Sequence, residues 1–286
     1  MRPLNIVAGA LGICAVLAGL VAFLEPRPPT DDLPREAVAR PSTWPDYSPS
    51  GPGFVPPATP DGHMVAYGYR LIADTPSVIG PSVNDQALRL AGNNLACQSC
   101  HLDAGTNRFG LPLVGVFRTY PKFSTRSGRV ISLVERIDEC MTRSMNGRRL
   151  PEGSREQEGF LAYLKYIGTP EAVVVRPAPG APERLDAARG ADAYGRLCAA
   201  CHQSDGLGKR RSSADATRGY EFPPLWGPDS FNDGAGMDRY EHVVGFVRRT
   251  MPRGVDPAKP SVSLQEAWDV AAFLQSRSRP PYAPGR

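Results

Sequence analysis

The sequence predicts a mainly α-helical chain of 286 residues, built from two similar domains in tandem. A pentapeptide of the form C-x-x-C-H occurs twice, as Cys97–His101 and again as Cys198–His202. After each copy comes a segment with the apolar spacing of an amphipathic helix. A proline-rich stretch, residues 169–182, separates the two copies. These observations place domain 1 at residues 61–168 and domain 2 at residues 183–286, and the chain is long enough for both to have their own cores.

Both pentapeptides have the spacing of covalent haem attachment, in which two thiols bond one haem and the adjacent histidine binds its iron. A single C-x-x-C would also fit zinc or dithiol chemistry. Two copies with histidine at the same offset, in a chain with four histidines, favour two covalently attached haem c groups and electron transfer. We therefore expect two cytochrome c-like domains. Six residues would hold the cofactors: Cys97, Cys100, His101, Cys198, Cys201 and His202.

Residues 1–24 have the composition of a transmembrane helix. Ile6–Leu24 has no charged side chain, follows Arg2, and at helical rise would extend about 28 Å, close to the thickness of a hydrocarbon core. The positive amino end is expected to stay in the cytoplasm, which places the rest of the chain on the periplasmic side of a bacterial inner membrane. A cleaved signal peptide, giving a periplasmic protein, is the alternative. Because no small-x-small site follows Leu24, we expect an uncleaved anchor.

Residues 25–60 are expected to form an extended tether between the anchor and domain 1. Eleven prolines lie between Pro26 and Pro60, and proline removes the backbone donors that a helix or a strand ladder needs. The formal net charge of +4 is only mildly basic. Basic and aromatic residues are not interleaved as they are on nucleic-acid-binding surfaces, so nucleic acid is excluded as a partner. The basic run 209–211 is either a solvated loop or a docking site for an acidic electron acceptor.

Domain 2 has the order of a small cytochrome c domain with one haem. Residues 187–197 predict a helix that leads directly into the second pentapeptide. The last helix is predicted to begin with a capping box formed by Ser263 and Glu266. Its buried face would carry four apolar residues, Leu264, Trp268, Ala271 and Leu274.

Between these helices, Met251 precedes Pro252. A methionine before proline, well downstream of the haem histidine, is typical of the loop that supplies the distal ligand in such domains. We therefore expect the second iron to have His202 and Met251 as axial ligands, with Met237 as the alternative to Met251.

Domain 1 repeats this plan with one difference. Residues Asn84–Asn93 predict a helix before the first pentapeptide, and Ser154 with Gln157 predicts a capping box at the start of the last helix. In place of a Met-Pro loop there is a further predicted helix. It begins at Ser132, with Glu135 as its capping partner, and ends near residues 146–147, an Asn-Gly pair.

This additional helix carries an unusual face. Arg136, Cys140 and Ser144 are four residues apart, so their side chains lie along one side. A guanidinium, a thiol and a hydroxyl on one face suit an anion. A lone cysteine is usually inert and buried, but this one accompanies a haem motif that has no evident sixth ligand. We therefore expect Cys140 to be functional, with Met141 and Met145 as competing ligands.

At this point the sequence resembles the dihaem thiosulfate dehydrogenase family. The matching stretches are Cys97–Thr106, Glu135–Ile137, Cys140–Arg148 and Phe231–Met237. The likeness covers both haem domains, roughly residues 65–280, and excludes the anchor and the tether. The cysteine-centred helix is far more specific than C-x-x-C-H alone. Other sulfur-oxidising haem proteins with cysteine-ligated domains are the nearest alternatives.

The resemblance implies roles for individual residues. Haem 1 would have His101 and Cys140 as axial ligands and would be the active site. Arg126 and Arg136 would hold the anionic substrate, and Ser144 belongs to the same set. Some family members have a lysine before the methionine ligand of haem 2 that can occupy the iron. This chain has threonine at position 250 and departs from that pattern.

The implied reaction joins two thiosulfate ions into tetrathionate. The cysteine sulfur would take up the first thiosulfate as an S-thiosulfonate, and the second would then release tetrathionate. Two electrons would pass from haem 1 through haem 2 to a soluble or membrane-bound cytochrome-type acceptor. Two other hypotheses stay open at this stage. One is a membrane-tethered electron carrier without chemistry of its own, and the other is the same site working as a tetrathionate reductase.

Overall fold

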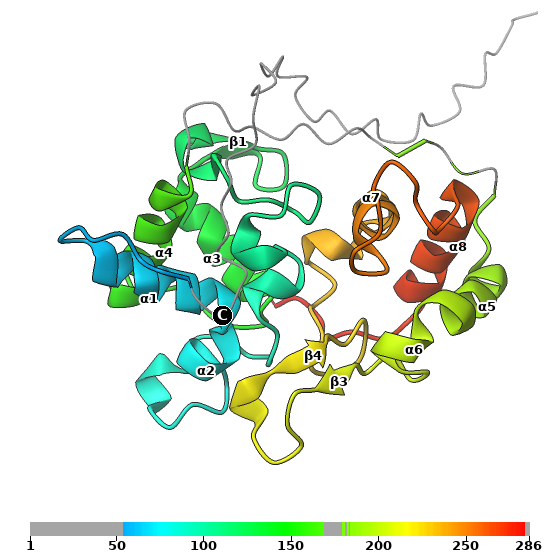
Figure 1. Cartoon of the computed structure of the whole chain (residues 1–286), viewed down its shortest axis with the longest axis horizontal. Helices are drawn as coiled ribbons and strands as arrows, with labels where there is room; N and C mark the ends of the chain where they lie inside the picture. Colours follow the sequence, from blue (N-terminus) through cyan, green and yellow to red (C-terminus); the bar gives the residue numbers. More distant parts are fainter. Residues whose placement is uncertain (1–53, 169–178, 181, 183, 284–286) are drawn as a thin grey trace, which may run out of the picture. The chain divides into compact units, whose positions relative to one another are not determined.

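The computed structural model describes residues 54–168, 179–180, 182 and 184–283. All of these belong to one unit of the chain, residues 37–286. The described part is mainly helical, with two short antiparallel hairpins (Figure 1). The predicted anchor and most of both predicted proline-rich linkers lie outside the described residues. In the part that the structure describes, every helix is too short or too polar to span a membrane.

Domain 1 has four α-helices and one hairpin within its described residues. In chain order they are α1 (Gly62–Ala73), α2 (Thr75–Ile79), β1 (Lys122–Ser124), β2 (Arg129–Ile131), α3 (Leu133–Arg143) and α4 (Arg155–Tyr166). Four short 3-10 turns lie between α2 and β1: η1 (Gln86–Leu88), η2 (Cys97–Ser99), η3 (Asp103–Gly105) and η4 (Val116–Thr119). Helices α1 and α4 pack together, and Gly68 allows this because a Cβ there would lie 1.9 Å from the carbonyl oxygen of Gly159.

The prediction of a helix over Asn84–Asn93 is wrong. Only η1 is helical in this stretch. The residues after it form backbone hydrogen bonds to distant segments instead, from Leu90 and Ala91 N–H to the carbonyl of Ile79, and from Gly92 N–H to the carbonyl of Met145. These long-range bonds use the donors that a local helix would need, so helical propensity is overridden.

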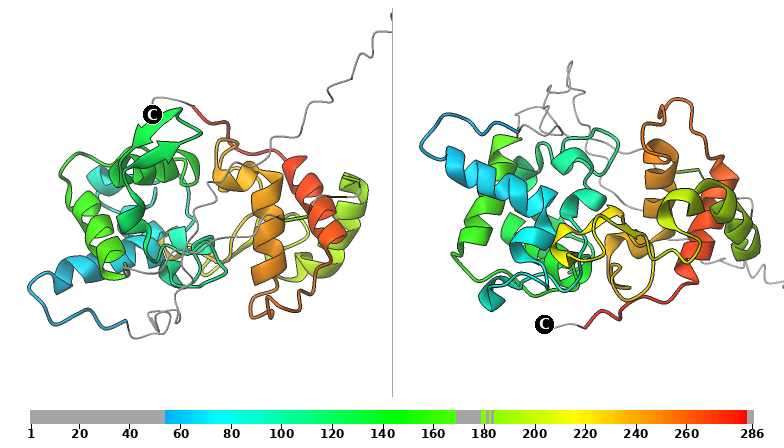
Figure 2. Two further views of the ribbon diagram at one scale, coloured as in Figure 1. Left: turned by 90° about the horizontal axis from the view of Figure 1, so that it is seen from above. Right: turned by 60° about the horizontal axis from the view of Figure 1, so that its bottom comes forward.

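Domain 2 has its own set of elements. They are α5 (Ala187–Leu197), α6 (Ala199–His202), β3 (Lys209–Arg210), β4 (Tyr220–Phe222), α7 (Tyr240–Thr250) and α8 (Leu264–Gln275), with 3-10 turns η5 (Ala216–Arg218) and η6 (Gly236–Asp238). Helix α5 has the predicted bounds and leads directly into the second pentapeptide. It packs against α8, and α7 packs against the same helix (Figure 2).

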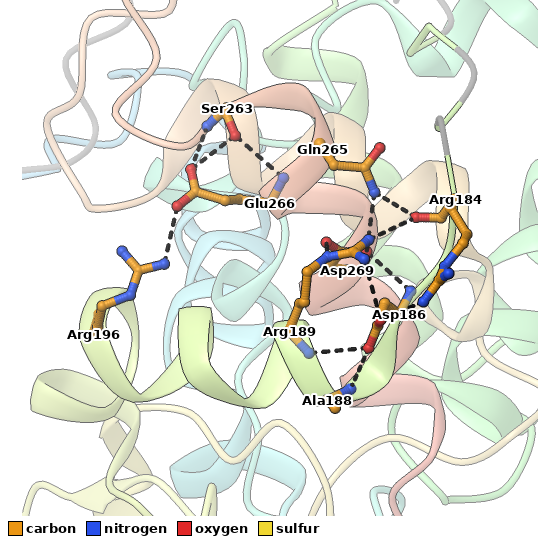
Figure 3. A network of polar contacts seen from close by, with 9 residues as sticks. All are labelled: Arg184, Asp186, Ala188, Arg189, Arg196, Ser263, Gln265, Glu266 and Asp269. Atoms are coloured by element: carbon orange, nitrogen blue, oxygen red, sulfur yellow. Dashed lines mark hydrogen bonds and ion pairs between the residues drawn. The ribbon is translucent and has the colours of Figure 1, made fainter.

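A buried carboxylate joins α5 to α8 (Figure 3). Asp269 on α8 is 3% exposed. It accepts hydrogen bonds from Nε and Nη2 of Arg189 at 2.8 and 2.9 Å, and from the backbone N–H of Asp186 at 2.9 Å. The side chain of Gln265 donates to it as well. Because every contact comes from the start of α5 or from α8 itself, this network fixes how the two helices cross.

The capping predictions can be compared with the structure residue by residue. The capping boxes at Ser132 and Ser263 are confirmed, with both reciprocal hydrogen bonds present. At the start of α4, Ser154 accepts from the N–H of Gln157 as predicted. The Gln157 side chain, however, accepts from Gly153 rather than from Ser154, so this cap is not reciprocal.

Candidate active site

Helix α3 positions the central residues of the site. Its capping box fixes the first turn, with Glu135 N–H donating to Ser132 Oγ at 3.1 Å and Ser132 N–H donating to Glu135 Oε2 at 2.7 Å. The apolar side of α3 is buried in the core of domain 1. The adjoining side carries Arg136 and Cys140, both partly exposed, and Ser144 follows as the C-cap residue.

The two methionines that compete with Cys140 as ligands occupy the apolar side. Met141 is 1% exposed and Met145 is 3% exposed, and both belong to the hydrophobic core of domain 1. Cys140 is therefore the sulfur-bearing residue of α3 that lies on the same side as Arg136.

The structure brings Cys140 close to the first C-x-x-C-H motif. Burial raises the pKa of Cys97 to about 11 and that of Cys100 to about 12, and negative charge on Cys140 adds to both increases. This electrostatic influence requires the three sulfur atoms to lie near one another. Thr75 also donates to the sulfur of Cys97 at 3.4 Å, which fixes one of the three.

Both pentapeptides present a donor set that fits haem c. His101 Nδ1 lies 2.5 Å from the carbonyl oxygen of Leu111, and His202 Nδ1 lies 2.8 Å from that of Pro223. A carbonyl oxygen only accepts, so the proton is on Nδ1 and the lone pair needed for a metal is on Nε2. Burial also lowers the pKa of His202, which favours the neutral ring.

Arg126 and Arg136 lie near Cys140, and Arg143 lies near Arg126. Arg126 lies on the turn between β1 and β2, and burial of its guanidinium, with the charges of Arg136 and Arg143 as further causes, lowers its pKa. The charge of Cys140 is the largest cause that raises the pKa of Arg136. The predicted pair Arg126 and Arg136 is thus brought together with Cys140, and Arg143 joins it. Guanidinium groups and a thiol are thus gathered at one place, which is the arrangement that an anion-binding role requires.

Glu139 connects the hairpin to α3. Its Oε2 lies 3.2 Å from Nη1 of Arg136, and its Oε1 accepts a hydrogen bond from the hydroxyl of Ser127 at 2.5 Å. Ser127 is the neighbour of Arg126, so one carboxylate pairs with Arg136 and also holds the turn that carries Arg126. Sequence reasoning missed Glu139 and Arg143. Each is three residues after a predicted site residue on the same helix, and because side chains at this spacing are neighbours, both could have been predicted from the sequence.

The second haem motif lies beside α7. Cys198 packs against the hydrophobic core of domain 2, to which Val243 and Val244 of α7 belong. Met251 is the first residue after α7 and is partly buried. The hydroxyl of Thr250, before it, donates to the carbonyl of Phe246 at 2.7 Å. The assignment of Met251 as the sixth ligand of haem 2 stays a prediction.

Two of the three charges in the basic run 209–211 are paired. Lys209 Nζ lies 2.8 Å from a carboxylate oxygen of Glu221, and Arg210 Nη2 lies 2.8 Å from one of Asp229. The guanidinium of Arg210 also stacks on the ring of Tyr220. These pairings weaken the hypothesis that the run is a docking site for an acidic protein.

Comparison with known protein families agrees with the two haem motifs. Residues 89–170 match the family model described as SoxA/TsdA, cytochrome c domain, and residues 187–278 match the cytochrome c family model. The first match contains the first pentapeptide and α3, and the second contains the second pentapeptide and α8. Two cytochrome c domains in tandem are therefore confirmed.

Curated relatives cover most of the chain. The thiosulfate dehydrogenase of Allochromatium vinosum is 39% identical over 229 residues, which are 77% of this chain and 79% of the relative. That of Thiomonas intermedia is 34% identical over 293 residues, 97% of this chain and 85% of the relative. A solved structure of thiosulfate dehydrogenase (TsdBA) from Marichromatium purpuratum has 30% identity and a TM-score of 0.69. The match covers 82% of this chain and 51% of that longer one.

Proposed function

The chain belongs to the thiosulfate dehydrogenase family, and we propose that it oxidises two thiosulfate ions to one tetrathionate ion. The observation that carries this proposal is the position of Cys140, close enough to both cysteines of the first haem motif and to Arg136 to influence the pKa of all three. A protein that only carried electrons would have no use for a thiol among arginines beside a haem motif. The same arrangement therefore favours an enzyme over a simple carrier.

The charges of the site fit a dianionic substrate. Arg126, Arg136 and Arg143 supply three positive charges and Glu139 supplies one negative charge, so these four side chains have a net charge of about +2 before the Cys140 thiolate is counted. Thiosulfate carries two negative charges, and two such ions repel each other. Fixed guanidinium groups reduce this repulsion, and their planar donors orient the oxygen atoms of the substrate.

Cys140 would supply the covalent step. Its thiolate bonds to the outer sulfur of the first thiosulfate to give an S-thiosulfonate, and two electrons leave the site. The outer sulfur of the second thiosulfate then attacks this adduct, tetrathionate departs, and the thiolate is restored. Charge balances in both steps. Haem c bound at each pentapeptide would supply the one-electron acceptors for these two electrons.

The remaining assignments belong to the same proposal. His101 and Cys140 would hold haem 1, with Cys140 released from it to react, and His202 and Met251 would hold haem 2. A thiolate ligand lowers the potential of an iron relative to methionine, so electrons would run from haem 1 to haem 2 and on to a cytochrome-type acceptor. Residues 1–24 would anchor the protein on the periplasmic side of the inner membrane.

Replacement of the thiol tests the proposal. Oxidised protein is mixed with thiosulfate, reduced protein with tetrathionate, and the haem absorption bands are followed in both. We expect rapid reduction of the haems by thiosulfate in the parent protein and its loss in Cys140→Ala, with both haems still attached. Thr142→Ala, on the same helix, is the matched control and should react like the parent. Retained reduction in Cys140→Ala would refute the role of the thiol, and rapid reaction with tetrathionate alone would favour the reductase.

A further inference from the structure

The C-terminal end of α3 is capped by another domain. The last carbonyl groups of a helix have no partner within the helix and need donors from elsewhere. Asn232 of domain 2 supplies two of them: its Nδ2 donates to the carbonyl of Thr142 at 2.9 Å, and its backbone N–H donates to that of Arg143 at 3.3 Å. Asn93 Nδ2 donates to the carbonyl of Ser144 at 2.9 Å.

The carbonyls of the preceding turn are satisfied locally. Gly147 N–H donates to Met141 at 2.9 Å, and Met145 N–H donates to Cys140 at 3.1 Å. The carbonyl groups at the end of α3 thus accept hydrogen bonds from two sources. Local residues complete the turn that contains Cys140, and a residue 90 positions away completes the next one. Without Asn232, two carbonyl groups of the last turn would have to find water or shift.

Asn232 lies in a segment, residues 229–235, that docks into domain 1 and that we name the clasp. Ser230 is 0% exposed, and its carbonyl accepts from the side-chain amides of Asn93 and Asn146 at 3.2 and 2.7 Å. The carboxylate of Asp229 accepts from the backbone N–H of Asn94 at 3.0 Å. Phe231, like Ala235 of the same segment, belongs to the hydrophobic core of domain 1. The clasp is therefore built into domain 1 and is not a loose surface contact.

The clasp also holds the third arginine of the site. Nη1 of Arg143 donates to the carbonyl of Gly234 at 3.2 Å, and its guanidinium lies 4.1 Å from the ring centroid of Tyr282. Tyr282 is tied to the clasp in turn, because its N–H donates to Asp233 Oδ1 at 2.7 Å. The position of the Arg143 guanidinium thus depends on two residues of domain 2, Gly234 and Tyr282.

We infer that Asn232 is a positioning residue for the helix that carries Cys140, and that domain 2 completes a site whose reacting groups all belong to domain 1. Asn232 is 3% exposed, so its effect on the site acts through α3. It fixes the last turn of α3 and, through the clasp, the direction of Arg143. The consequence for turnover rests on the proposed function, whereas the consequence for the order of α3 does not.

Two substitutions separate the side-chain donor from the rest of the residue. Asn232→Asp keeps the shape, the backbone bond to Arg143 and the acceptor for Gly234 N–H, which lies 3.1 Å away, but it removes the Nδ2 donor. Asn232→Ala removes the whole carboxamide. Ser263→Ala is the matched control, because it removes the N-cap of α8 in the same domain without touching the clasp.

The test uses the full protein with both haems. Hydrogen–deuterium exchange of the α3 amides is measured beside that of α8, and the ferric electron paramagnetic resonance signals of the two haems are recorded separately. We expect both Asn232 variants to speed exchange in the last turn of α3 by about fivefold to tenfold. The haem 1 signal should shift or broaden while that of haem 2 stays the same. Ser263→Ala should speed exchange in α8 alone.

Three results would overturn the inference: unchanged exchange in α3, an unchanged haem 1 signal despite faster exchange, or the same changes in Ser263→Ala. Each can be obtained even if Cys140→Ala retains turnover, so this inference and the proposed function fail separately.

Discussion

Replacement of Arg136 by glutamine measures the anion-binding charge at the site. The substitution removes one positive charge and leaves a neutral side chain of similar length on the same face of α3. Arg136 has one carboxylate partner, Glu139, at 3.2 Å, and its side chain is 37% exposed. With Arg136 replaced, the net charge of the four groups falls from about +2 to about +1, which weakens their attraction for thiosulfate.

The size of the effect follows from these contacts. A hydrogen bond to a charged partner contributes about 1.5–3 kcal/mol, and the exposure of Arg136 favours the lower part of this range because water screens the charge. A loss of about 1.5–2 kcal/mol corresponds to roughly a 10- to 30-fold decrease in kcat/KM. Arg136→Lys keeps the charge without the planar pair of donors, so a smaller loss is expected there.

The assay is steady-state reduction of an artificial acceptor over a range of thiosulfate concentrations, repeated at increasing ionic strength. Arg155→Gln is the control, because this arginine lies on α4 and stacks on Tyr67, 4.2 Å from the ring centroid. The dependence of kcat/KM on salt should be weaker in Arg136→Gln, since a site charge has been removed. A kcat/KM within about twofold of the parent value, with an unchanged salt dependence, would refute the anion-binding role of Arg136.

Two further predictions concern the framework of the site. The backbone hydrogen bond from Ser132 is the largest cause that lowers the pKa of Glu135, to about 2. A carboxyl group whose pKa is lowered by folding stabilises the folded state at pH values above its unfolded-state pKa, and this stabilisation is lost as the pH falls. The melting temperature of Glu135→Gln should therefore be below that of the parent at pH 7 and approach it between pH 4.5 and 2. A difference in melting temperature that stays constant with pH would contradict this. Asp269→Ala leaves Arg189 and a backbone donor without their buried acceptor and should lower the free energy of unfolding by about 2–3 kcal/mol in chemical denaturation. Asp192→Ala, on the same helix as Arg189, is its control, and an equal effect of both would contradict the role of the buried pair.

Features that depend on neighbouring residues were predictable from the sequence. The two pentapeptides, the bounds of α5 and the capping boxes at Ser132 and Ser263 each involve groups within a few positions of one another. The four-residue spacing of Arg136 and Cys140 likewise predicts their shared side of α3. Local geometry decides all of these, so a single sequence is enough.

Features that depend on distant partners were not predictable. The stretch Asn84–Asn93 has helical spacing, but its backbone donors are used by Ile79 and Met145. Contacts of this kind depend on how the whole chain packs, and local propensity cannot reveal them. Asn232 in the clasp is a second example of a contact with a distant partner, in this case beside the candidate site. Its segment was part of the family resemblance, yet nothing in its local sequence shows that its amide caps a helix 90 positions earlier.

The two ends of α3 show why this matters for the site. The first turn is held by Ser132 and Glu135, three positions apart, so domain 1 carries everything needed to begin the helix. The last turn, which leads to Ser144 and carries Arg143, is held by donors from Asn93 and from Asn232 in domain 2. We therefore expect a change in the clasp to act on the last turn of α3 in domain 1, although it is made in domain 2. The side chain of Asn232 therefore contributes both to the order of the last turn of α3 and to the contact between the two domains.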